Sequence, residues 1–431
     1  MTFLRERFHE AAASPSPPSR LSGDEVYVTA WRRRRVRNRL ASAVVGGGAA
    51  VIVAAVAVLT TAGGPDRGAP APAASDAASM APSARPTAIA NGRPDIGDGV
   101  VQDAVATDLD HLYAVRLRCA SGDYSSCEGV LYGSDDGGRT WTERNRDNPY
   151  LLDVPAAGVI GALFPKGGNS AAWRFSIDGG RTWKDRKSSP GTISAVPADG
   201  WATCREDDEQ GLSQCAVYGV DAKTGVEKKL AQQPPTITPS GINRVPSGAG
   251  LWVSGFVPQT HVVGVSVSRD DGRTWSTHVF GQGEADYPQD INNQSVGIAT
   301  IDGTTAYAVV SIVTDNGQNR LLVYRTTDGG LTWQRADPGH TLPWVQHGAD
   351  SFVAADGTHI VQTVVDKPAE WYAGTTGAYI KPAPVSGLEG TDDMQQPVRN
   401  DAPDTYIVFD RTAVYVSPDG LHWTQHPVKP S

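Results

Sequence analysis

Five copies of one short octet limit what this chain of 431 residues can fold into. The octet reads SDDGGRTW from Ser134, SIDGGRTW from Ser176 and SRDDGRTW from Ser268. It returns as TTDGGLTW from Thr326 and, one residue shorter, as SPDGLHW from Ser417. Successive starts are 42, 92, 58 and 91 residues apart, so two intervals are nearly double the others. Self-similarity of this kind is typical of a repeat fold, in which each unit packs against its neighbours.

Each long interval contains a segment that has the strands of a unit but lacks the octet. These segments are VYGVDAKTGVEKKL at residues 217–230 and WYAGTTGAYIKPAP at residues 371–384. Both read as a strand, a glycine-bearing turn and a second strand. With them, seven units fit between residues 99 and 431, at about 48 residues per unit.

Each unit is predicted to contain four short strands. In the unit around Thr326 they are NQSVGIAT, TAYAVVSIV, RLLVYRT and LTWQRA, with IDGT and TDNGQN as turns. The first unit parallels it with VVQDAVATD, HLYAVRLRC, EGVLYGS and RTWTER. Helical periodicity is nearly absent after residue 99. Four-strand units of about 40–50 residues predict an all-β fold, a seven-bladed β-propeller.

The residue types of the octet suit a tight turn. Aspartate at position three accepts hydrogen bonds from turn amides, and glycine at position five supplies a positive φ. Hydroxyls at positions one and seven can bond to nearby backbone, and the tryptophan closes the turn as an apolar plug. These roles are structural. The residues expected to hold them are Ser134, Asp136, Gly138, Trp141, Ser176, Asp178, Gly180, Trp183, Ser268, Asp270, Gly272, Trp275, Thr326, Asp328, Gly330, Trp333, Ser417, Asp419 and Trp423.

The aspartates of DDGG and DDGR raise the alternative of a calcium loop. An EF-hand loop needs oxygen ligands at positions 1, 3 and 5 and a glutamate at position 12. Position 12 is Arg146 when counted from Asp135, and Gly281 when counted from Asp270. We therefore expect no metal at these turns, and no other motif in the chain points to a metal or a cofactor.

The octets resemble the Asp-box, also called the bacterial neuraminidase repeat, S-x-D-x-G-x-T-W. Three copies match in full, the copy at Thr326 matches with threonine first, and the copy at Ser417 is one residue short. Families that carry the box include sialidases, sortilin-type receptors, photosystem II assembly factors and some cellulose-active enzymes. In them the box joins the third and fourth strands of a propeller blade, on the outer rim and away from the active site. The resemblance covers roughly 330 residues and implies a structural role for the octet.

The chain before the repeats is predicted to cross a membrane once. Residues 40–62 are free of charge and long enough to span about 30 Å of hydrocarbon as a helix. WRRRRVRNR stands directly before them, so the N-terminus is expected in the cytoplasm and the repeats outside the cell. A cleaved signal peptide fits less well, because its apolar core is usually about 7–15 residues. The expected domains are a basic cytoplasmic tail at 1–39, a transmembrane helix at 40–62, a Pro/Ala/Ser-rich disordered linker at 63–98 and the propeller at 99–431.

Charge separates the tail from the rest of the chain. Residues 1–39 carry nine arginines and four acidic residues, whereas the whole chain has a net charge of −9. The part after the tail therefore has a net charge of −14. An acidic body argues against nucleic acid as a partner, because phosphate contacts need clustered lysine and arginine.

The four cysteines form two local pairs in the sequence, Cys119 with Cys127 and Cys204 with Cys215. Neither pair has the spacing of a zinc site or a CxxC redox motif. Each pair brackets a polar loop between two strand-like runs, so we expect two local disulfides and an oxidising compartment. Four free thiols are the alternative.

A sialidase would need further residues that the sequence does not clearly supply. Sialidases clamp a carboxylate with three arginines and use a tyrosine–glutamate pair as nucleophile and an aspartate as acid and base. Their first arginine lies in an (F/Y)-R-I-P motif ahead of the first box, and residues 92–133 contain none. The stretch most similar to this motif is Asn243-Arg244-Val245-Pro246, in the fourth unit. Seven units also differ from the six blades usual in sialidases.

A ligand site, if present, is expected where the innermost strands begin at one mouth of the central channel. The candidate residues there are Asp103, Asp153, Arg244, Asn292, Trp344, His347 and Arg399. Aromatic, carboxylate and arginine side chains together suit a sugar or an acidic peptide, and the alternative is a solvated rim without a ligand. We expect a membrane-tethered, non-catalytic module that binds an extracellular glycan or protein. The alternative is a sialidase-like exo-glycosidase.

Overall fold

The computed structural model describes residues 99–119, 127–167, 170–206, 214–284, 287, 294–313, 319–345, 349–363, 370–381, 383–388 and 398–429. All of them belong to one compact unit. They contain strands, bridges and turns, and this part of the chain has no helix. In particular, none of its segments is a long apolar helix of the kind that crosses a membrane. The predicted tail, transmembrane helix and linker, residues 1–98, lie outside the described residues.

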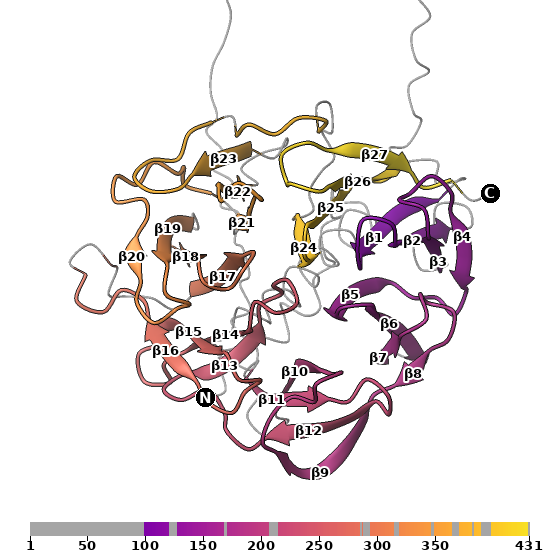
Figure 1. The fold of residues 1–431 in the computed structure, drawn as a ribbon, viewed down its shortest axis with the longest axis horizontal. Helices are drawn as coiled ribbons and strands as arrows, with labels where there is room; N and C mark the ends of the chain where they lie inside the picture. Colours follow the sequence, from indigo (N-terminus) through magenta and orange to yellow (C-terminus); the bar gives the residue numbers. More distant parts are fainter. Residues whose placement is uncertain are drawn as a thin grey trace, which may run out of the picture. The chain divides into compact units, whose positions relative to one another are not determined.

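The described strands form seven sheets that follow one another around a ring (Figure 1). Each sheet is one blade of a β-propeller, as predicted from the seven units. Blades 1 and 2 contain β1 (Val100–Ala106), β2 (Leu112–Cys119), β3 (Cys127–Ser134), β4 (Thr142–Asn145), β5 (Leu151–Ala156), β6 (Val159–Gly167), β7 (Ser170–Ser176) and β8 (Lys184–Asp185). Blades 3 and 4 contain β9 (Lys187–Ile193), β10 (Trp201–Glu206), β11 (Cys215–Val220), β12 (Val226–Leu230), β13 (Thr238–Ile242), β14 (Leu251–Phe256), β15 (Val263–Ser268) and β16 (Ser276–Val279). Blades 5, 6 and 7 contain β17 (Gln294–Thr300), β18 (Ala306–Val313), β19 (Asn319–Thr326), β20 (Gln334–Arg335), β21 (Ala349–Val353), β22 (His359–Thr363), β23 (Glu370–Gly374), β24 (Arg399–Ala402), β25 (Thr405–Phe409), β26 (Ala413–Ser417) and β27 (Thr424–Pro427).

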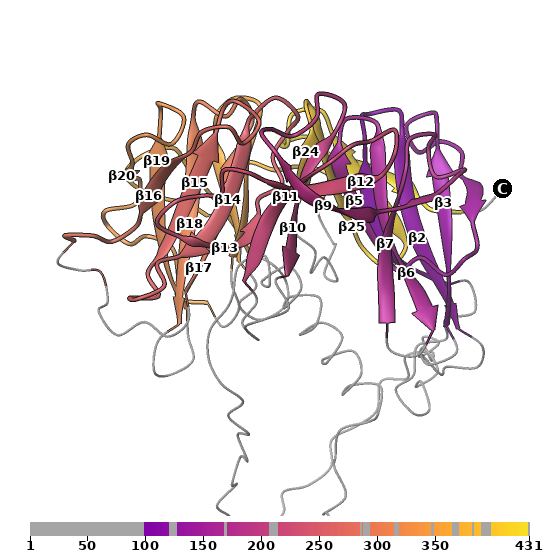
Figure 2. The same cartoon turned by 90° about the horizontal axis from the view of Figure 1, so that it is seen from below.

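Five blades have the same simple topology. In blades 1, 2, 4, 5 and 7 the strand order follows the chain, and all neighbouring strands are antiparallel. The first strand lies nearest the ring centre and the fourth lies at the outside (Figure 1). The strands of neighbouring blades run along the axis of the ring (Figure 2). In each of these five blades the octet joins the third strand to the fourth, as predicted.

The two blades that lack the octet also lack this arrangement. In blade 3 the order is β10-β11-β12-β9, and β9 pairs with β12 in parallel, unlike the other described strand pairs. The first strand of blade 3 in chain order is therefore its outermost strand, and β10 is its innermost. Blade 6 has only β21, β22 and β23, with a single antiparallel bridge between Ala373 and Ile380 beyond them. The prediction of four regular strands in every unit is therefore wrong for blade 6, because this segment forms one bridge in place of a fourth strand.

The octet turn is closed by side-chain hydrogen bonds. Ser134 Oγ donates to the Asp136 carboxylate at 2.8 Å and accepts from the Gly138 amide at 2.8 Å. Asp136 also accepts from the Thr140 amide and hydroxyl at 2.9 and 2.7 Å. These bonds lower the pKa of Asp136 to about 2. The same threonine bonds recur around Asp178, Asp270 and Asp328, so four of the turns share one hydrogen-bond pattern.

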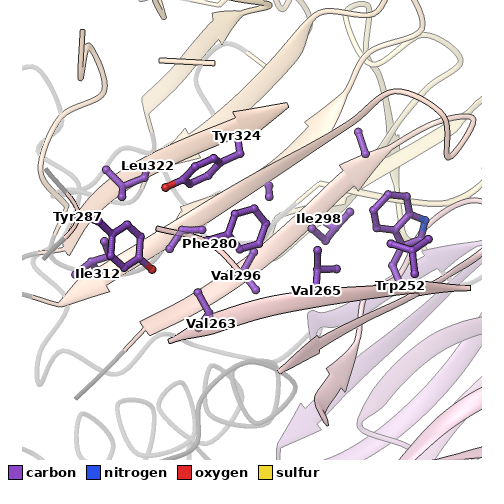
Figure 3. Packing of buried hydrophobic residues seen from close by; sticks show 14 residues of the cluster. Trp252, Val263, Val265, Phe280, Tyr287, Val296, Ile298, Ile312, Leu322 and Tyr324 are labelled. Carbon is purple, nitrogen blue, oxygen red and sulfur yellow. The ribbon is translucent and has the colours of Figure 1, made fainter. Parts of the chain in front are cut away.

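Blade cores form mainly between sheets, from side chains that alternate along each strand. Figure 3 shows the cluster between blades 4 and 5, where Trp252, Phe280 and Tyr324 are buried among aliphatic side chains of β15 and β17. The rings of Phe280 and Tyr324 lie 4.8 Å apart. Offset aromatic pairs of this kind stabilise a core by about 0.5–1.5 kcal/mol beyond their area burial. Because neighbouring blades pack face to face, their innermost strands are held at fixed positions around the ring.

One of the two predicted disulfides is present in the described residues. Cys204 on β10 is bonded to Cys215 on β11, with their Cα atoms 5.4 Å apart. Cys127 is also disulfide-bonded and lies opposite Cys119 in the register of β2 and β3. None of the described cysteines is free. The pairing of Cys119 with Cys127 stays a prediction.

Blades 7 and 1 close the ring without sharing a strand. The amide of Val101 on β1 donates to the carbonyl of Arg411 at 2.7 Å. An apolar cluster that includes Val101, Ile407 and Val416 lies between the two blades. A buried ion pair between Arg399 and Asp103 adds to the closure.

Candidate functional site

The structure describes five of the seven predicted site residues and connects four of them. Arg399 pairs with Asp103, and Arg244 pairs with Asp153. The charge of Asp153 also acts on Arg399. Trp344 is half-exposed beside the bridge between Val345 and Asn319 in blade 5, and no described contact joins it to the other four. Asn292 and His347 lie outside the described residues.

Irregular pairing on the inner strands accompanies three of these residues. The register between first and second strands shifts between Val101 and Asp103 in blade 1, between Asp153 and Ala156 in blade 2, and between Arg399 and Ala402 in blade 7. A β-bulge inserts an extra residue into one strand and re-aims the side chains beside it. Such bulges are frequent next to binding and active sites.

Asp103 and Arg399 tie three blades together. The Asp103 carboxylate is fully buried and accepts from the Ala104 amide at 2.9 Å and the Leu152 amide at 3.0 Å. Arg399 lies 3.2 Å from Asp103 and donates to the carbonyl of Leu152, also at 3.2 Å. Although burial lowers the pKa of Arg399, the neighbouring carboxylates of Asp103, Asp401 and Asp153 raise it overall. Because these groups are committed to one another, Asp103 and Arg399 have a structural role that joins blades 7, 1 and 2.

The second pair, Arg244 with Asp153, is more open and reaches across blade 3. Arg244 follows β13 of blade 4, whereas Asp153 is on β5 of blade 2, 91 residues away. The Arg244 side chain is 39% exposed and the Asp153 side chain 18%. Blade 3, which has the irregular topology, stands between these two blades in the chain. Of its strands, β10 lies nearest the ring centre (Figure 1).

Two further arginines, which sequence reasoning did not select, lie in the same place. Arg186 stands between β8 and β9, and its Nη1 donates to Thr203 Oγ1 of β10 at 2.8 Å. Arg205, at the end of β10, pairs with Glu227 at 3.1 Å. The charges of Asp153, Glu227, Arg244 and Arg205 all act on Arg186. We call Arg186, Arg205 and Arg244, with Asp153 and Glu227, the arginine cluster.

Arg186 differs from the other two arginines of the arginine cluster in its partner. Arg205 and Arg244 each have a carboxylate, but Arg186 has only the neutral Thr203 hydroxyl within the described part of the chain. Arg186 is partly buried, and burial lowers the pKa of its guanidinium, although the nearby charges of Glu227 and Asp153 oppose this shift. A charge taken out of water is costly unless it is paired. The arginine cluster therefore holds three cations and two anions, and its excess positive charge is on Arg186.

The donors of the arginine cluster suit an anion, and none of the described carboxyl groups has a resolved upward pKa shift of the kind a catalytic acid needs. A guanidinium presents a planar fork of donors that matches a carboxylate in two hydrogen bonds. A glycosidase acid needs a raised pKa, whereas every described carboxyl group with a resolved pKa shift is shifted downward. The described tyrosine–carboxylate contacts are Tyr324 with Glu284, Tyr372 with Glu370 and Tyr415 with Asp410. All three tyrosines are on the third strands of their blades, away from the arginine cluster.

Metal ligands do not gather in the part of the chain that the structure describes. No group of three or more histidine, cysteine, aspartate or glutamate side chains there is arranged to hold an ion. In the first octet Asp136 accepts from the hydroxyls of Ser134 and Thr140, whereas Asp135 pairs with Arg144 and Arg181.

No known family model and no curated protein match this sequence. Similar solved structures include a GH74 xyloglucanase from Xanthomonas campestris, 14% identical over 77% of this chain and 55% of its own, with a TM-score of 0.45. A puromycin-hydrolyzing peptidase from Mycobacterium tuberculosis is 13% identical over 77% of this chain and 53% of its own, with a TM-score of 0.44. A Hadza microbial sialidase is 14% identical over 66% of this chain and 65% of its own, with a TM-score of 0.34. The chain spans about half the length of the first two. Likeness of this degree transfers neither a substrate nor an activity.

Proposed function

We propose that this protein is a membrane-tethered, non-catalytic binding module whose propeller holds a carboxylate-bearing glycan or protein outside the cell. The observation that carries the proposal is the position of Arg186, a partly buried guanidinium whose described hydrogen bond is to the neutral Thr203 hydroxyl. A guanidinium that has lost part of its hydration and has a neutral partner is stabilised when an anionic group binds beside it. The charge-assisted hydrogen bonds to the anion then offset the free energy of the lost hydration. Arg244, which is part-exposed, is the second donor that such a group would meet.

Carboxylate binding is tested with the purified full-length chain and two sugars that differ in charge. Calorimetry should detect binding of methyl glucuronide, which has one carboxylate, and at least tenfold weaker binding of methyl glucoside. Arg186→Gln should reduce glucuronide binding by at least tenfold, since a charge-assisted hydrogen bond is lost. The matched control is Arg146→Gln, because Arg146 is an exposed arginine on the outer side of blade 1, paired with Glu143. Equal affinity for both sugars, or no effect of Arg186→Gln, would remove this proposal.

A sialidase-like exo-glycosidase is the second candidate, and the gathering of three arginines favours it. It is tested by incubating the same chain with a fluorogenic sialoside. Fluorophore release that disappears in Arg244→Ala would replace the binding module with an enzyme. Binding of sialoside or glucuronide without release is the outcome expected here.

The membrane tether rests on residues 40–62 and on the arginines before them. Protease added to intact cells should digest the propeller and leave the N-terminal tail protected. A propeller that resists protease until the cells are opened would contradict the proposed orientation.

A further inference from the structure

One histidine lies completely buried at the boundary between blades 5 and 6. His359, the first residue of β22, has an exposed fraction of 0%. Its ring stacks on Tyr307 of blade 5 at 4.2 Å with an interplanar angle of 7°. Its Nδ1 lies 2.6 Å from the hydroxyl of Tyr379. The imidazole therefore forms part of the contact surface between two blades.

One nitrogen of this ring has no partner in either neutral form. If the Tyr379 hydroxyl donates to Nδ1, the ring proton is on Nε2; if Nδ1 donates to that hydroxyl, Nε2 is a bare acceptor. In both cases Nε2 is buried among described residues without a hydrogen-bond partner. Adding a proton makes both nitrogens donors and places a positive charge where no acceptor faces Nε2.

Among the residues that the structure describes, no titratable or charged group around His359 offers a counter-charge. Tyr307 and Tyr379 are the two groups that touch the ring, and burial raises the pKa of both, so both are neutral. Behind Tyr307 lies Arg325, whose guanidinium is 5.8 Å from the ring centre of Tyr307. The nearest carboxylate to act on Tyr379 is Asp337.

Asp337 is already occupied. Its carboxylate accepts from the amide and hydroxyl of Thr341 and from the amide of Leu342. Burial alone accounts for the low pKa of His359, about 3, and no charged group offsets it. The folded boundary therefore tolerates only the neutral imidazole.

We propose that the boundary between blades 5 and 6 is an acid-sensitive latch, which protonation of His359 opens. When the blades separate, water reaches the ring and His359 regains its ordinary pKa of about 6.5. A group that binds a proton only in the open state shifts the equilibrium toward that state as the pH falls. Between pH 6.5 and pH 4.5 the open population should rise about fiftyfold by this linkage.

Two amides report directly on this opening because their hydrogen bonds cross the boundary. The Gly377 amide of blade 6 donates to the carbonyl of Ala336 in blade 5 at 2.7 Å. The Tyr379 amide donates to Thr341 Oγ1, also at 2.7 Å. The control is the Val196 amide, which donates to the Asp271 carbonyl across the boundary between blades 3 and 4 at 2.8 Å; no histidine is among the described contacts of that boundary.

Hydrogen exchange of the full-length chain, corrected for intrinsic rates, tests the latch. Between pH 6.5 and 4.5 the protection of Gly377 and Tyr379 should fall about fiftyfold relative to that of Val196. In His359→Phe, which keeps a ring against Tyr307 but cannot be protonated, this relative change should vanish. Equal loss of protection at all three amides in the unsubstituted chain would overturn the latch, and that comparison does not depend on how well the variant folds. A pH effect that persists in His359→Phe would also overturn it.

Discussion

The blades that carry the octet and the two that lack it differ in how their outer strand is attached. In blades 1, 2, 4, 5 and 7 the octet turns the chain from the third strand into an antiparallel fourth strand. In blade 3 the outer strand β9 comes from the chain ahead of the blade, and in blade 6 it is reduced to one bridge. The octet therefore accompanies one specific connection. The β11–β12 turn of blade 3 keeps an aspartate and a threonine, since Asp221 accepts from the amide and hydroxyl of Thr224, but it has no tryptophan after them.

The largest effect that can sharpen this comparison comes from two glycines with positive φ. Gly330 of the fourth octet has φ +91°, and an added Cβ would lie 2.8 Å from Val267 Cγ2. Gly377, in the turn of blade 6 that lacks the octet, has φ +100° and open space around it. Gly330→Ala should destabilise the protein by about 2–4 kcal/mol, from backbone strain plus overpacking, and Gly377→Ala by about 1 kcal/mol from strain alone. Denaturant unfolding measures both, and equal losses would show that the octet glycine is not specially packed.

The second largest effect is expected from removing the disulfide of blade 3, one of the two blades without an octet. The bond between Cys204 and Cys215 closes a loop with a sequence separation of 11. Replacing both cysteines by serine should lower the free energy of unfolding by about 2–3 kcal/mol. Without the disulfide this short loop is no longer closed in the unfolded chain, so the conformational entropy of the unfolded chain rises. The change should be visible in the same denaturant experiment. Non-reducing peptide mapping should also find Cys119 linked to Cys127, and a free Cys119 would contradict the predicted pairing.

A smaller effect separates a complete octet from the shortened one. The indole N–H of Trp333 donates to the Gly330 carbonyl at 3.1 Å, whereas that of Trp423 is buried without a partner among the described residues. Phenylalanine removes the indole N–H at both positions and keeps an aromatic ring in each. Trp333→Phe should therefore cost about 1–2 kcal/mol more than Trp423→Phe, because only the first loses a hydrogen bond. A larger cost at Trp423 would mean that its indole nitrogen has a role in the folded state.

The smallest effect concerns the exposed aspartates of the octets in acid. Their hydrogen bonds lower the pKa of Asp136, Asp270 and Asp328 to about 2, below the ordinary value of 3.8. The stabilisation is present above pH 3.8 and is lost as the pH falls through about 2. Exchange of the Thr332 amide should accelerate over this window and should be pH-independent after correction in Asp328→Asn. Blade 6, which has no octet, should instead lose protection from pH 6.5 downward, through His359.

Much of the fold follows from interactions between residues that are close together in the sequence. The bonds from Ser134 and Thr140 to Asp136 span two to four residues, so the octet alone predicts its turn. Hairpins such as β2 and β3 are likewise fixed by adjacent runs of alternating residues. The number of blades followed from spacing. The position of β9 did not, because its parallel partner β12 lies more than thirty residues further along the chain and no turn signal joins them.

The candidate site was predictable only in part, for the same reason. Asp153 and Arg244 were found because each lies near a predicted inner strand. Arg186 was not, because it stands between two outer strands and reaches Thr203 only through the tertiary packing of blade 3. An arginine such as Arg186, which is partly buried and donates to a hydroxyl group, cannot be recognised from the spacing of residues in the sequence. Its environment becomes visible only when strands from separate blades are brought together.

The closure of the ring has a consequence for how the molecule is made. Each described sheet is assembled from strands that are consecutive in the chain, and no described strand of blade 7 joins the sheet of blade 1. A ribosome can therefore release complete modules one after another, each stacking on its predecessor, while the final joint waits for the C-terminal residues. In the described residues that joint consists of a backbone hydrogen bond from Val101 to Arg411, an apolar cluster and the ion pair of Arg399 with Asp103. Synthesis that stops early would leave a stacked arc with two bare ends, ready to meet a second arc.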